Sequence, residues 1–228
     1  MKEEVENKFE WPGWSLKNNP HGKDFDIDAR KRMVYGSEIL LPFIYKYKNK
    51  LGDFILEVGP FFNPLTSIKN FPEKNICYWE NDLYVLHWLL KYNKFDPKIK
   101  SIYCNLNEIE GDSFMELKHE TYNYFNDLNN TSKLFNSVMI SQVLNYVDYK
   151  LFLIILKNFI KKDSILFINN VIDYGLPKFF SSKRPKNNKE IINTIKEIEY
   201  EVIEHEIIKS PFPKSQPNDR LILVIKNK

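Results

Sequence analysis

The sequence predicts an α/β fold in which helices cover both faces of a mostly parallel, doubly wound sheet. Short apolar runs, typical of strands buried on both faces, alternate with stretches whose apolar residues recur at helical spacing. The run at 54–58 is the clearest, because Gly59 and two nearby prolines end it abruptly. Further strands are expected at 75–80, 100–104, 136–141 and 164–171. This alternation of strand and helix is the pattern of a doubly wound sheet.

The helical stretches frame these strands. Residues 26–50 carry apolar side chains at three- and four-residue steps, and Pro42 should kink or split that helix. A short helix is expected to open at Asn63-Pro64 after the first strand. Longer helices are expected at about 83–90, 113–128, 149–160 and 190–199. Two final strands, 201–208 and 220–225, flank a proline-rich connection.

Length and composition indicate one domain. The chain has 228 residues, 43% of them hydrophobic and 28% charged, with a net charge of +3 that does not argue for a nucleic-acid partner. We expect residues 1–50 to form an amino-terminal arm and helix, and residues 51–228 to form the core. No apolar run reaches membrane-spanning length and no signal-peptide core is present, so a cytoplasmic protein is expected.

The sulfur and imidazole side chains do not suggest a metal centre. Cys77 and Cys104 are expected to be buried, reduced thiols. The four histidines are scattered along the chain, and no pair has metal-ligand spacing with either cysteine.

Two acids mark the ends of the first two expected strands. Glu57 interrupts the apolar run at 54–58, where a poorly solvated carboxylate needs a partner such as backbone N–H groups or a cation. Glu80 ends the second strand, 23 residues further on (80 − 57). Nucleotide-binding α/β folds place a ribose-binding acid about 20 residues beyond the glycine turn. The spacing therefore favours a nucleotide-like ligand at this edge of the sheet.

The segments around these acids carry a family resemblance. E-V-G-P-F-F-N-P (57–64), C-Y-W-E-N-D (77–82), I-Y-C-N-L-N (102–107) and V-M-I-S-Q-V-L-N-Y-V (138–147) resemble motifs of class I S-adenosylmethionine-dependent methyltransferases. The resemblance implies a Rossmann-like, seven-stranded, mostly parallel sheet with a C-terminal antiparallel strand, helices on both faces and an N-terminal helical extension. It also implies that S-adenosylmethionine lies across the carboxyl ends of the first strands.

The glycine loop departs from the family pattern. Only the first of three glycines, Gly59, is kept, and Phe61 and Asn63 stand at the other two places. Phenylalanine tolerates positive φ poorly. The loop therefore either takes a different path or no longer binds the ligand.

The resemblance implies a set of cofactor-binding residues. It places them in the loop after the first strand and at the ends of the second, third and fourth strands. They are Glu57, Gly59, Pro60, Phe61, Asn63, Glu80, Asn81, Asn105, Leu106, Ser141 and Gln142. One of Arg30, Lys31 and Arg32 could reach the cofactor's carboxylate.

Candidate catalytic residues lie at the expected mouth of the site. A general base within hydrogen-bond reach would help a hydroxyl or amine nucleophile. The candidates are His21, Tyr146, Asp173 and Tyr174. Basic residues at 178–189, among paired aromatics, could bind an anionic substrate or form a solvated loop.

Three functions remain open at this point. The first is methyl transfer to a small-molecule or glycan-precursor acceptor. The second is a non-catalytic protein of the same fold that binds a nucleotide or a protein partner through the altered loop. The third, a nucleic-acid methyltransferase, lacks a stacking platform or a strongly basic face. The oligomeric state is left open.

Overall fold

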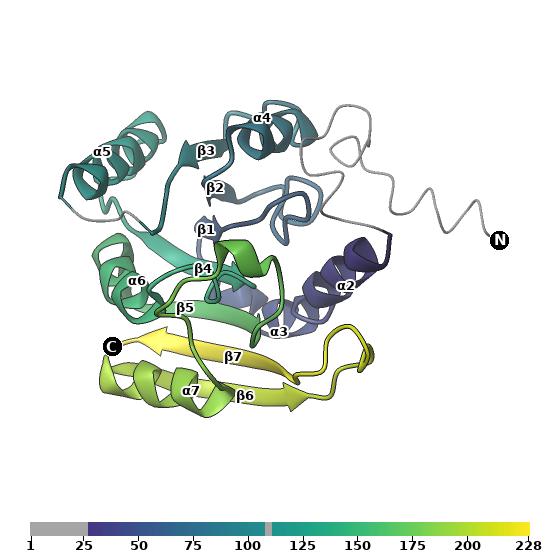
Figure 1. The fold of residues 1–228 in the computed structure, drawn as a ribbon. Coiled ribbons are helices and arrows are strands. Elements are labelled where there is room, and N and C mark those ends of the chain that lie inside the picture. The colour runs from purple at the N-terminus through teal and green to yellow at the C-terminus, as the bar shows by residue number, and fades with distance from the viewer. Residues whose placement is uncertain (1–26, 108–110) are drawn as a thin grey trace.

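Seven strands form one sheet in the order β3-β2-β1-β4-β5-β7-β6 (Figure 1). The structure is a computed structural model that describes residues 27–107 and 111–228. The strands are β1 (Phe54–Val58), β2 (Asn75–Glu80), β3 (Ile99–Tyr103), β4 (Phe135–Ser141), β5 (Ile160–Val171), β6 (Tyr200–Ile208) and β7 (Arg220–Asn227). β1 to β5 pair in parallel, whereas β7 is antiparallel to both β5 and β6. The predicted seven-stranded, doubly wound sheet is confirmed.

Helices cover both faces of the sheet, as expected. On one face lie α2 (Ile27–Glu38), α3 (Leu41–Lys46) and α4 (Leu83–Tyr92). On the other lie α5 (Gly111–Asp127), α6 (Tyr149–Leu156) and α7 (Asn188–Glu197). Single 3₁₀ turns occupy Lys48–Lys50, Lys157–Phe159 and Pro177–Phe179.

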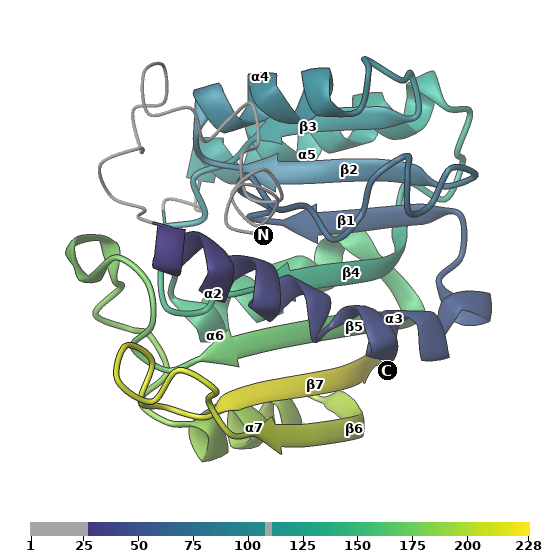
Figure 2. The same cartoon turned by 90° about the vertical axis from the view of Figure 1, so that its right-hand side faces the viewer.

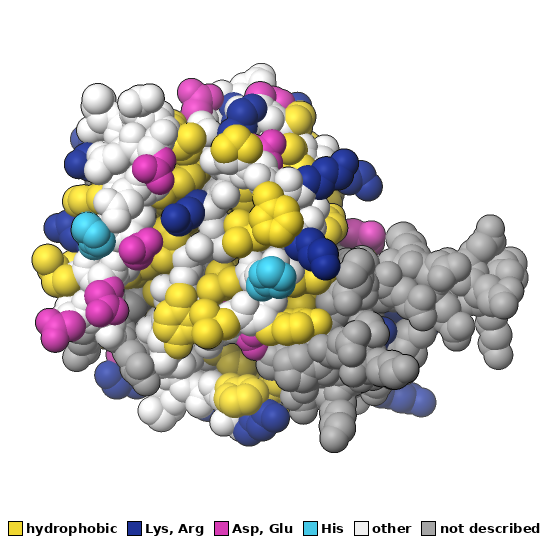
Figure 3. All heavy atoms as spheres, turned by 90° about the horizontal axis from the view of Figure 1, so that it is seen from above, with side chains coloured by type: hydrophobic (Ala, Val, Ile, Leu, Met, Phe, Trp, Pro, Cys, Tyr) yellow, Lys and Arg dark blue, Asp and Glu magenta, His cyan; other side chains and the backbone are white. Residues whose placement is uncertain are grey.

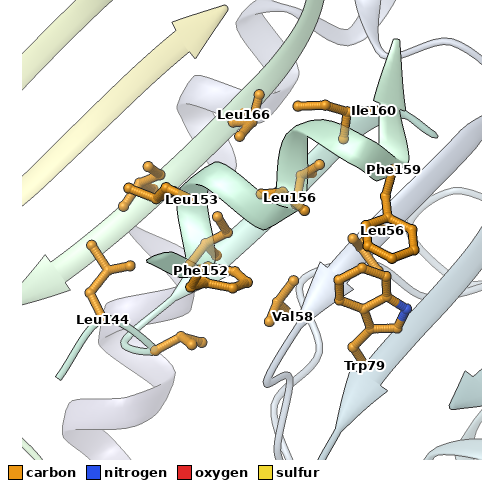
Figure 4. Close-up of a cluster of buried hydrophobic side chains, with 14 of the residues drawn as sticks. Leu56, Val58, Trp79, Leu144, Phe152, Leu153, Leu156, Phe159, Ile160 and Leu166 are labelled. Carbon is orange, nitrogen blue, oxygen red and sulfur yellow. The ribbon is translucent and has the colours of Figure 1, made fainter. Parts of the chain in front are cut away.

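The face covered by α6 shows why the first strands are so apolar. Leu56 and Val58 of β1 point toward α6, beside Trp79 of β2 (Figure 4). The Phe159 ring packs edge-on against the Trp79 indole, with ring centroids 4.8 Å apart. This cluster continues through β4, β5 and β7, so the sheet is buried along its length on this side.

The two elements before β1 follow the expectation from Pro42. α2 ends at Glu38 and α3 begins at Leu41, with Pro42 in its first turn, where a missing N–H costs nothing. Figure 2 shows α2 beginning beside the carboxyl ends of the parallel strands and α3 lying toward their amino ends. The predicted split of this helix is confirmed.

The prediction of a short helix that opens at Asn63-Pro64 is wrong. Residues 59–74 form a loop of turns that connects β1 to β2 without a helix. Phe62, Leu65 and Phe71 of this loop fill the space over the sheet that a helix would otherwise cover. Its backbone groups are satisfied by side chains of neighbouring elements, which makes the coil an adequate connection.

The β3 edge of the sheet carries several exposed large apolar side chains. Figure 3 looks onto this edge and shows apolar side chains gathered among charged ones. The exposed large apolar residues of α4, β3, α5 and the adjoining turn are Leu83, Tyr92, Phe95, Tyr103 and Met115. Of the helices in the described part of the chain, none combines the length and apolar character needed to cross a membrane.

Candidate functional site

The candidate site lies at the edge where the parallel strands end. Because β7 runs in the opposite direction, it begins at this same edge, next to the end of β5. The loop after β5 and the loop between β6 and β7 also lie there (Figure 2). Open α/β sheets bind ligands outside the carboxyl ends of their strands.

Glu57 fastens the loop that follows β1. Its carboxylate is buried and accepts hydrogen bonds from the backbone N–H of Leu65 and of Thr66, both at 2.7 Å, and from the Thr66 hydroxyl at 2.5 Å. Burial raises the pKa of Glu57 to about 7, although these three donors act against that rise. The partner that the sequence required is therefore the backbone of the chain's own loop.

Two further side chains hold the same loop. The Tyr78 hydroxyl donates to the Thr66 carbonyl at 2.5 Å. Asn93 accepts from the Ile68 N–H at 3.1 Å, and its amide donates to the Tyr78 hydroxyl at 3.3 Å. Tyr78 and Asn93 are fully buried, so these bonds fix the loop against the sheet.

Glu80 lies at the end of β2 against the turn that follows β1. Its Oε2 accepts from the Phe61 N–H at 3.1 Å and its Oε1 accepts from the Asn81 N–H at 2.9 Å. Burial raises the pKa of Glu80 to about 7. A carboxylate has about four acceptor positions, and backbone hydrogen bonding from Asp82 also acts on Glu80, so about one position remains for a hydroxyl of a ligand. The structure thus brings together Glu80 and the variant loop, which the sequence placed at neighbouring strand ends.

The turn after β1 keeps one glycine and places a phenylalanine where the family pattern has a second. Gly59 has φ of 61°, and a Cβ there would come within 2.8 Å of Val143 Cγ2. Phe61 also takes a positive φ, 49°, despite its side chain. This backbone path aims the Phe61 N–H at Glu80. Pro60 between them is buried.

Asn63 faces α2. Its amide donates to the Met33 carbonyl at 3.2 Å and to the Ser37 hydroxyl. Both contacts tie the loop to the helix, so the amide serves as a clamp between the two elements.

The ends of β2 and β3 present the remaining expected cofactor residues. Asn81 is exposed and follows Glu80 directly. Asn105 is half-buried and accepts from the Asn107 N–H at 3.2 Å, in a turn beyond β3. Leu106 packs against the buried cluster beneath α5. These side chains border the same edge as Glu80.

Ser141 and Gln142 at the end of β4 connect the site to β5. The Ser141 hydroxyl accepts from the Asn169 amide at 3.1 Å. Gln142 has φ of 63°, and its Oε1 accepts from the Val171 N–H at 3.2 Å. Its Nε2 is buried and has no hydrogen-bond partner among the described residues. An unsatisfied buried amide at a strand end is a candidate ligand contact.

Three of the candidate catalytic residues lie on the segments that follow β4 and β5. Burial raises the pKa of Tyr146, and its hydroxyl accepts from the Leu176 N–H at 3.0 Å. The exposed Asp173 has φ of 54° and accepts from Arg184 Nε at 2.7 Å. The Tyr174 hydroxyl accepts from Arg32 Nε at 3.4 Å. His21 lies outside the described residues, and so does any contact that it makes.

The basic loop at 178–189 is partly neutralised within the chain. Lys183 pairs with Asp148 at 2.8 Å, and Arg184 pairs with Asp173. A pocket of about 140 Å³ lies beside the second pair, lined by Asp173, Ser182, Arg184, Pro185 and Lys186. No group of acidic, histidine or cysteine side chains within the described ranges could hold a metal ion.

Sequence reasoning missed Arg220 and Asn169 at this edge. Arg220 opens β7 and is 1% exposed, and its Nη1 donates to Asn169 Oδ1 at 2.5 Å. Asn169 also donates to the Gly36 carbonyl at 2.6 Å, which joins α2 to the sheet. A polar pair, Asn169-Asn170, ending an apolar strand is the signal that could have revealed this cluster.

Comparison with known proteins supports the fold alone. No protein-family model and no curated protein matches the sequence. Solved structures do match, at identities of 10–13%, which establish a shared fold.

Three of these structures illustrate the likeness. The 1,6-didemethyltoxoflavin-N1-methyltransferase of Burkholderia thailandensis, with bound 1,6-didemethyltoxoflavin and S-adenosylhomocysteine, has a TM-score of 0.60 at 10% identity, over 86% of this chain and 79% of that one. The N-methyltransferase NodS of Bradyrhizobium japonicum WM9, in complex with S-adenosylhomocysteine, has a TM-score of 0.59 at 13% identity. The match covers 99% of this chain and 97% of that one. The [4+2]-cyclase SpnF has a TM-score of 0.59 at 10% identity, over 88% of this chain and 81% of that one.

Proposed function

We propose that this protein is an S-adenosylmethionine-dependent methyltransferase that acts on a small-molecule or glycan-precursor acceptor. The observation that carries the proposal is the pairing of Glu80 with the turn after β1, at the carboxyl edge of a sheet with this strand order. The chain also shares its fold with two methyltransferases crystallised with S-adenosylhomocysteine. Their acceptors are small molecules or are not stated, which leaves the acceptor to be argued from this chain.

The residues at the edge fit an adenosine-containing cofactor. Glu80 keeps about one acceptor position for a ribose hydroxyl beside the backbone N–H groups of Phe61, Asn81 and Asp82. Gly59 brings the backbone close to the strand end, where a side chain would collide with Val143. Asn105, beyond β3, is placed to meet the base.

The chain contributes mainly positioning. S-adenosylmethionine, when bound, supplies an electrophilic methyl group on a sulfonium. Fixing two reactants in line accounts for much of the rate in such a transfer. The Phe61 ring borders the turn and could present its face to the cation, an attraction worth about 0.5–2 kcal/mol. A tyrosine phenol is already neutral at physiological pH, and burial raises the pKa of Tyr146 further. It can orient a nucleophile by hydrogen bonding, but it is not the base.

Calorimetric titration tests the proposal directly. The full chain should bind S-adenosylmethionine and S-adenosylhomocysteine saturably, and Glu80→Ala should weaken both at least tenfold. Each hydrogen bond to a charged group contributes about 1.5–3 kcal/mol, and 1.4 kcal/mol is tenfold in affinity. Glu116→Ala, which removes an exposed acid on α5, is the matched control and should bind normally.

One observation favours the non-catalytic alternative. The Phe61 N–H already occupies an acceptor position of Glu80, through a residue held at positive φ. If the loop is a permanent seal, neither compound will give heat in the titration. Such a flat isotherm with the wild-type chain would reject methyl transfer and favour a nucleotide- or protein-binding role.

A further inference from the structure

A buried arginine at the start of β7 has unused donors. Arg220 is 1% exposed and lies on the face of the sheet covered by α2. Only its Nη1 forms a hydrogen bond, to Asn169. Nε and Nη2 are buried and have no partner in the described part of the chain.

The unused donors form a fork. In a planar guanidinium the N–H of Nε and one N–H of Nη2 point in the same direction from one edge. That edge matches the two oxygens of a carboxylate, which accept two parallel hydrogen bonds from it. The bond to Asn169 uses the other terminal nitrogen, so the fork is left intact.

The fold makes room for this side chain. A Cβ at Gly36 of α2 would lie 3.0 Å from Arg220 Nη1 and 3.2 Å from Nη2. The Tyr35 ring lies under the guanidinium, with 5.7 Å from Cζ to the ring centroid. α2, β5 and β7 therefore hold the arginine in place without neutralising its charge.

Within the described ranges, the positive charge of Arg220 has no acidic partner. No carboxylate among the described residues pairs with it. Burial lowers the pKa of Arg220 to about 10, so it remains a cation at neutral pH. An unpaired buried ion costs several kcal/mol. A bound anion would remove that cost.

A second buried group lies four residues earlier in the chain. Gln216, in the loop between β6 and β7, is 1% exposed, and neither its Nε2 nor its Oε1 has a partner among the described residues. Its neighbour Ser215 accepts from Arg32 Nη1 at 3.2 Å, which brings a second cation to this loop. The loop that leads into β7 thus carries a buried amide without a partner and contacts a cation of α2.

We propose that Arg220, assisted by Gln216, binds a carboxylate group of a ligand at the β5–β7 end of the site. Four strand spacings separate β2, with Glu80, from β7, or about 19 Å at about 4.8 Å each. We assign the carboxylate to a molecule other than the one held by Glu80, and the competition with S-adenosylhomocysteine described below tests that assignment. On the proposed function, on which this assignment rests, that molecule is the methyl acceptor, and the acceptor is a carboxylic acid.

Acetate and acetamide are a matched pair of probes, because they share size and shape and differ in charge. The full ¹⁵N-labelled chain is titrated with each at constant ionic strength, and the Arg220 Nε–H resonance is followed. Acetate should shift it saturably and raise Tm, and acetamide should do neither. Equal responses to both, or tighter binding of inorganic phosphate than of acetate, would overturn the proposal.

Arg220→Lys keeps the charge and removes the planar fork, so it should weaken acetate binding at least tenfold. The affinity is read from the rise in Tm with acetate concentration. Lys150→Gln, which removes one exposed positive charge on α6, should bind acetate as the wild type does. If Arg220→Lys fails to fold, Gln216→Leu takes its place and should weaken acetate at least threefold. An unchanged affinity in Arg220→Lys refutes the role of the fork, and an unchanged affinity in Gln216→Leu refutes the part assigned to Gln216.

S-adenosylhomocysteine separates this inference from the proposed function. Arg220→Lys should bind it with unchanged affinity, and acetate should not compete with it. Competition would place the fork in the cofactor site and overturn the acceptor assignment. If the wild type binds acetate at Arg220 but does not bind S-adenosylhomocysteine, the methyltransferase proposal is rejected and the carboxylate site at Arg220 stands.

Discussion

At the scale of single residues, Glu57 ties the site's chemistry to the stability of the fold. Burial raises its pKa from 4.5 to about 7, so the folded chain holds a proton that the unfolded chain releases between those values. The stabilisation of the folded chain by this bound proton is therefore fully present below about pH 4.5, and it is lost as pH rises through about 7. The shift corresponds to on the order of 3 kcal/mol.

Replacing Glu57 by Gln should flatten this dependence. Between pH 5 and pH 8 the unfolding free energy of the wild type should fall relative to that of Glu57→Gln, because glutamine does not titrate. Urea unfolding at several pH values measures the difference. Glu206→Gln, at an exposed position on β6, should follow the wild type. Parallel curves for wild type and Glu57→Gln would mean that Glu57 stays charged throughout.

Gly59 and Gly111 allow backbone strain to be separated from crowding. Both have positive φ, 61° and 54°, but a Cβ would meet Val143 at 2.8 Å at the first and nothing within 4 Å at the second. Gly111→Ala should cost about 1–2 kcal/mol, the strain alone. Gly59→Ala should lower the unfolding free energy by more than Gly111→Ala does. Adding Val143→Ala to the Gly59→Ala variant should recover part of that excess. Equal costs in urea unfolding would show that the turn at Gly59 has room for a side chain.

At the scale of elements, the loop from β1 to β2 takes the place of a helix. The Tyr78 hydroxyl bonds the Thr66 carbonyl and the Asn93 amide, both within or against this loop. Tyr78→Phe should cost about 1–3 kcal/mol, because it leaves buried partners unsatisfied. Hydrogen exchange of residues 64–71 should accelerate in this variant.

A tyrosine on the opposite face provides the comparison. The Tyr200 hydroxyl donates to the Leu153 carbonyl at 3.0 Å, beneath α6. Tyr200→Phe should leave exchange in residues 64–71 as it is in the wild type. Acceleration of this loop by both variants would indicate global loosening and not loss of a local anchor.

The same elements show what sequence can and cannot predict. β1 and β2 have the expected ends because short apolar runs, the first ended by Gly59 and the second flanked by polar residues, are decided locally. The helix at Asn63 failed because the anchors of that loop, among them Tyr78 and Asn93, lie on other elements. Arg220 escaped notice because its place at the site depends on the reversed direction of β7, and a residue's own neighbours do not reveal that.

At the scale of the whole molecule, two thiols report cooperative unfolding. Cys77 and Cys104 are buried beside the core under α5, and burial raises the pKa of Cys104 to about 12 and that of Cys77 further. A thiol reagent should therefore label neither until the sheet opens. Labelling rates in rising urea should extrapolate to the global unfolding free energy. Rapid labelling of either cysteine in buffer alone would show that the β2–β3 side opens by itself.

The reversal of β7 has a consequence for how the protein can diversify. The crossovers from β1 to β5 carry helices and a loop that pack against both faces of the sheet, so the core constrains their packed parts. The connection between β6 and β7 is a hairpin, whose length can change without shifting the strand pairings. It delivers Gln216 and Arg220 to the site edge. Insertions there would alter which ligands fit beside β7 and leave the Glu80 side unchanged, so ligand preference can drift while the rest of the site stays fixed.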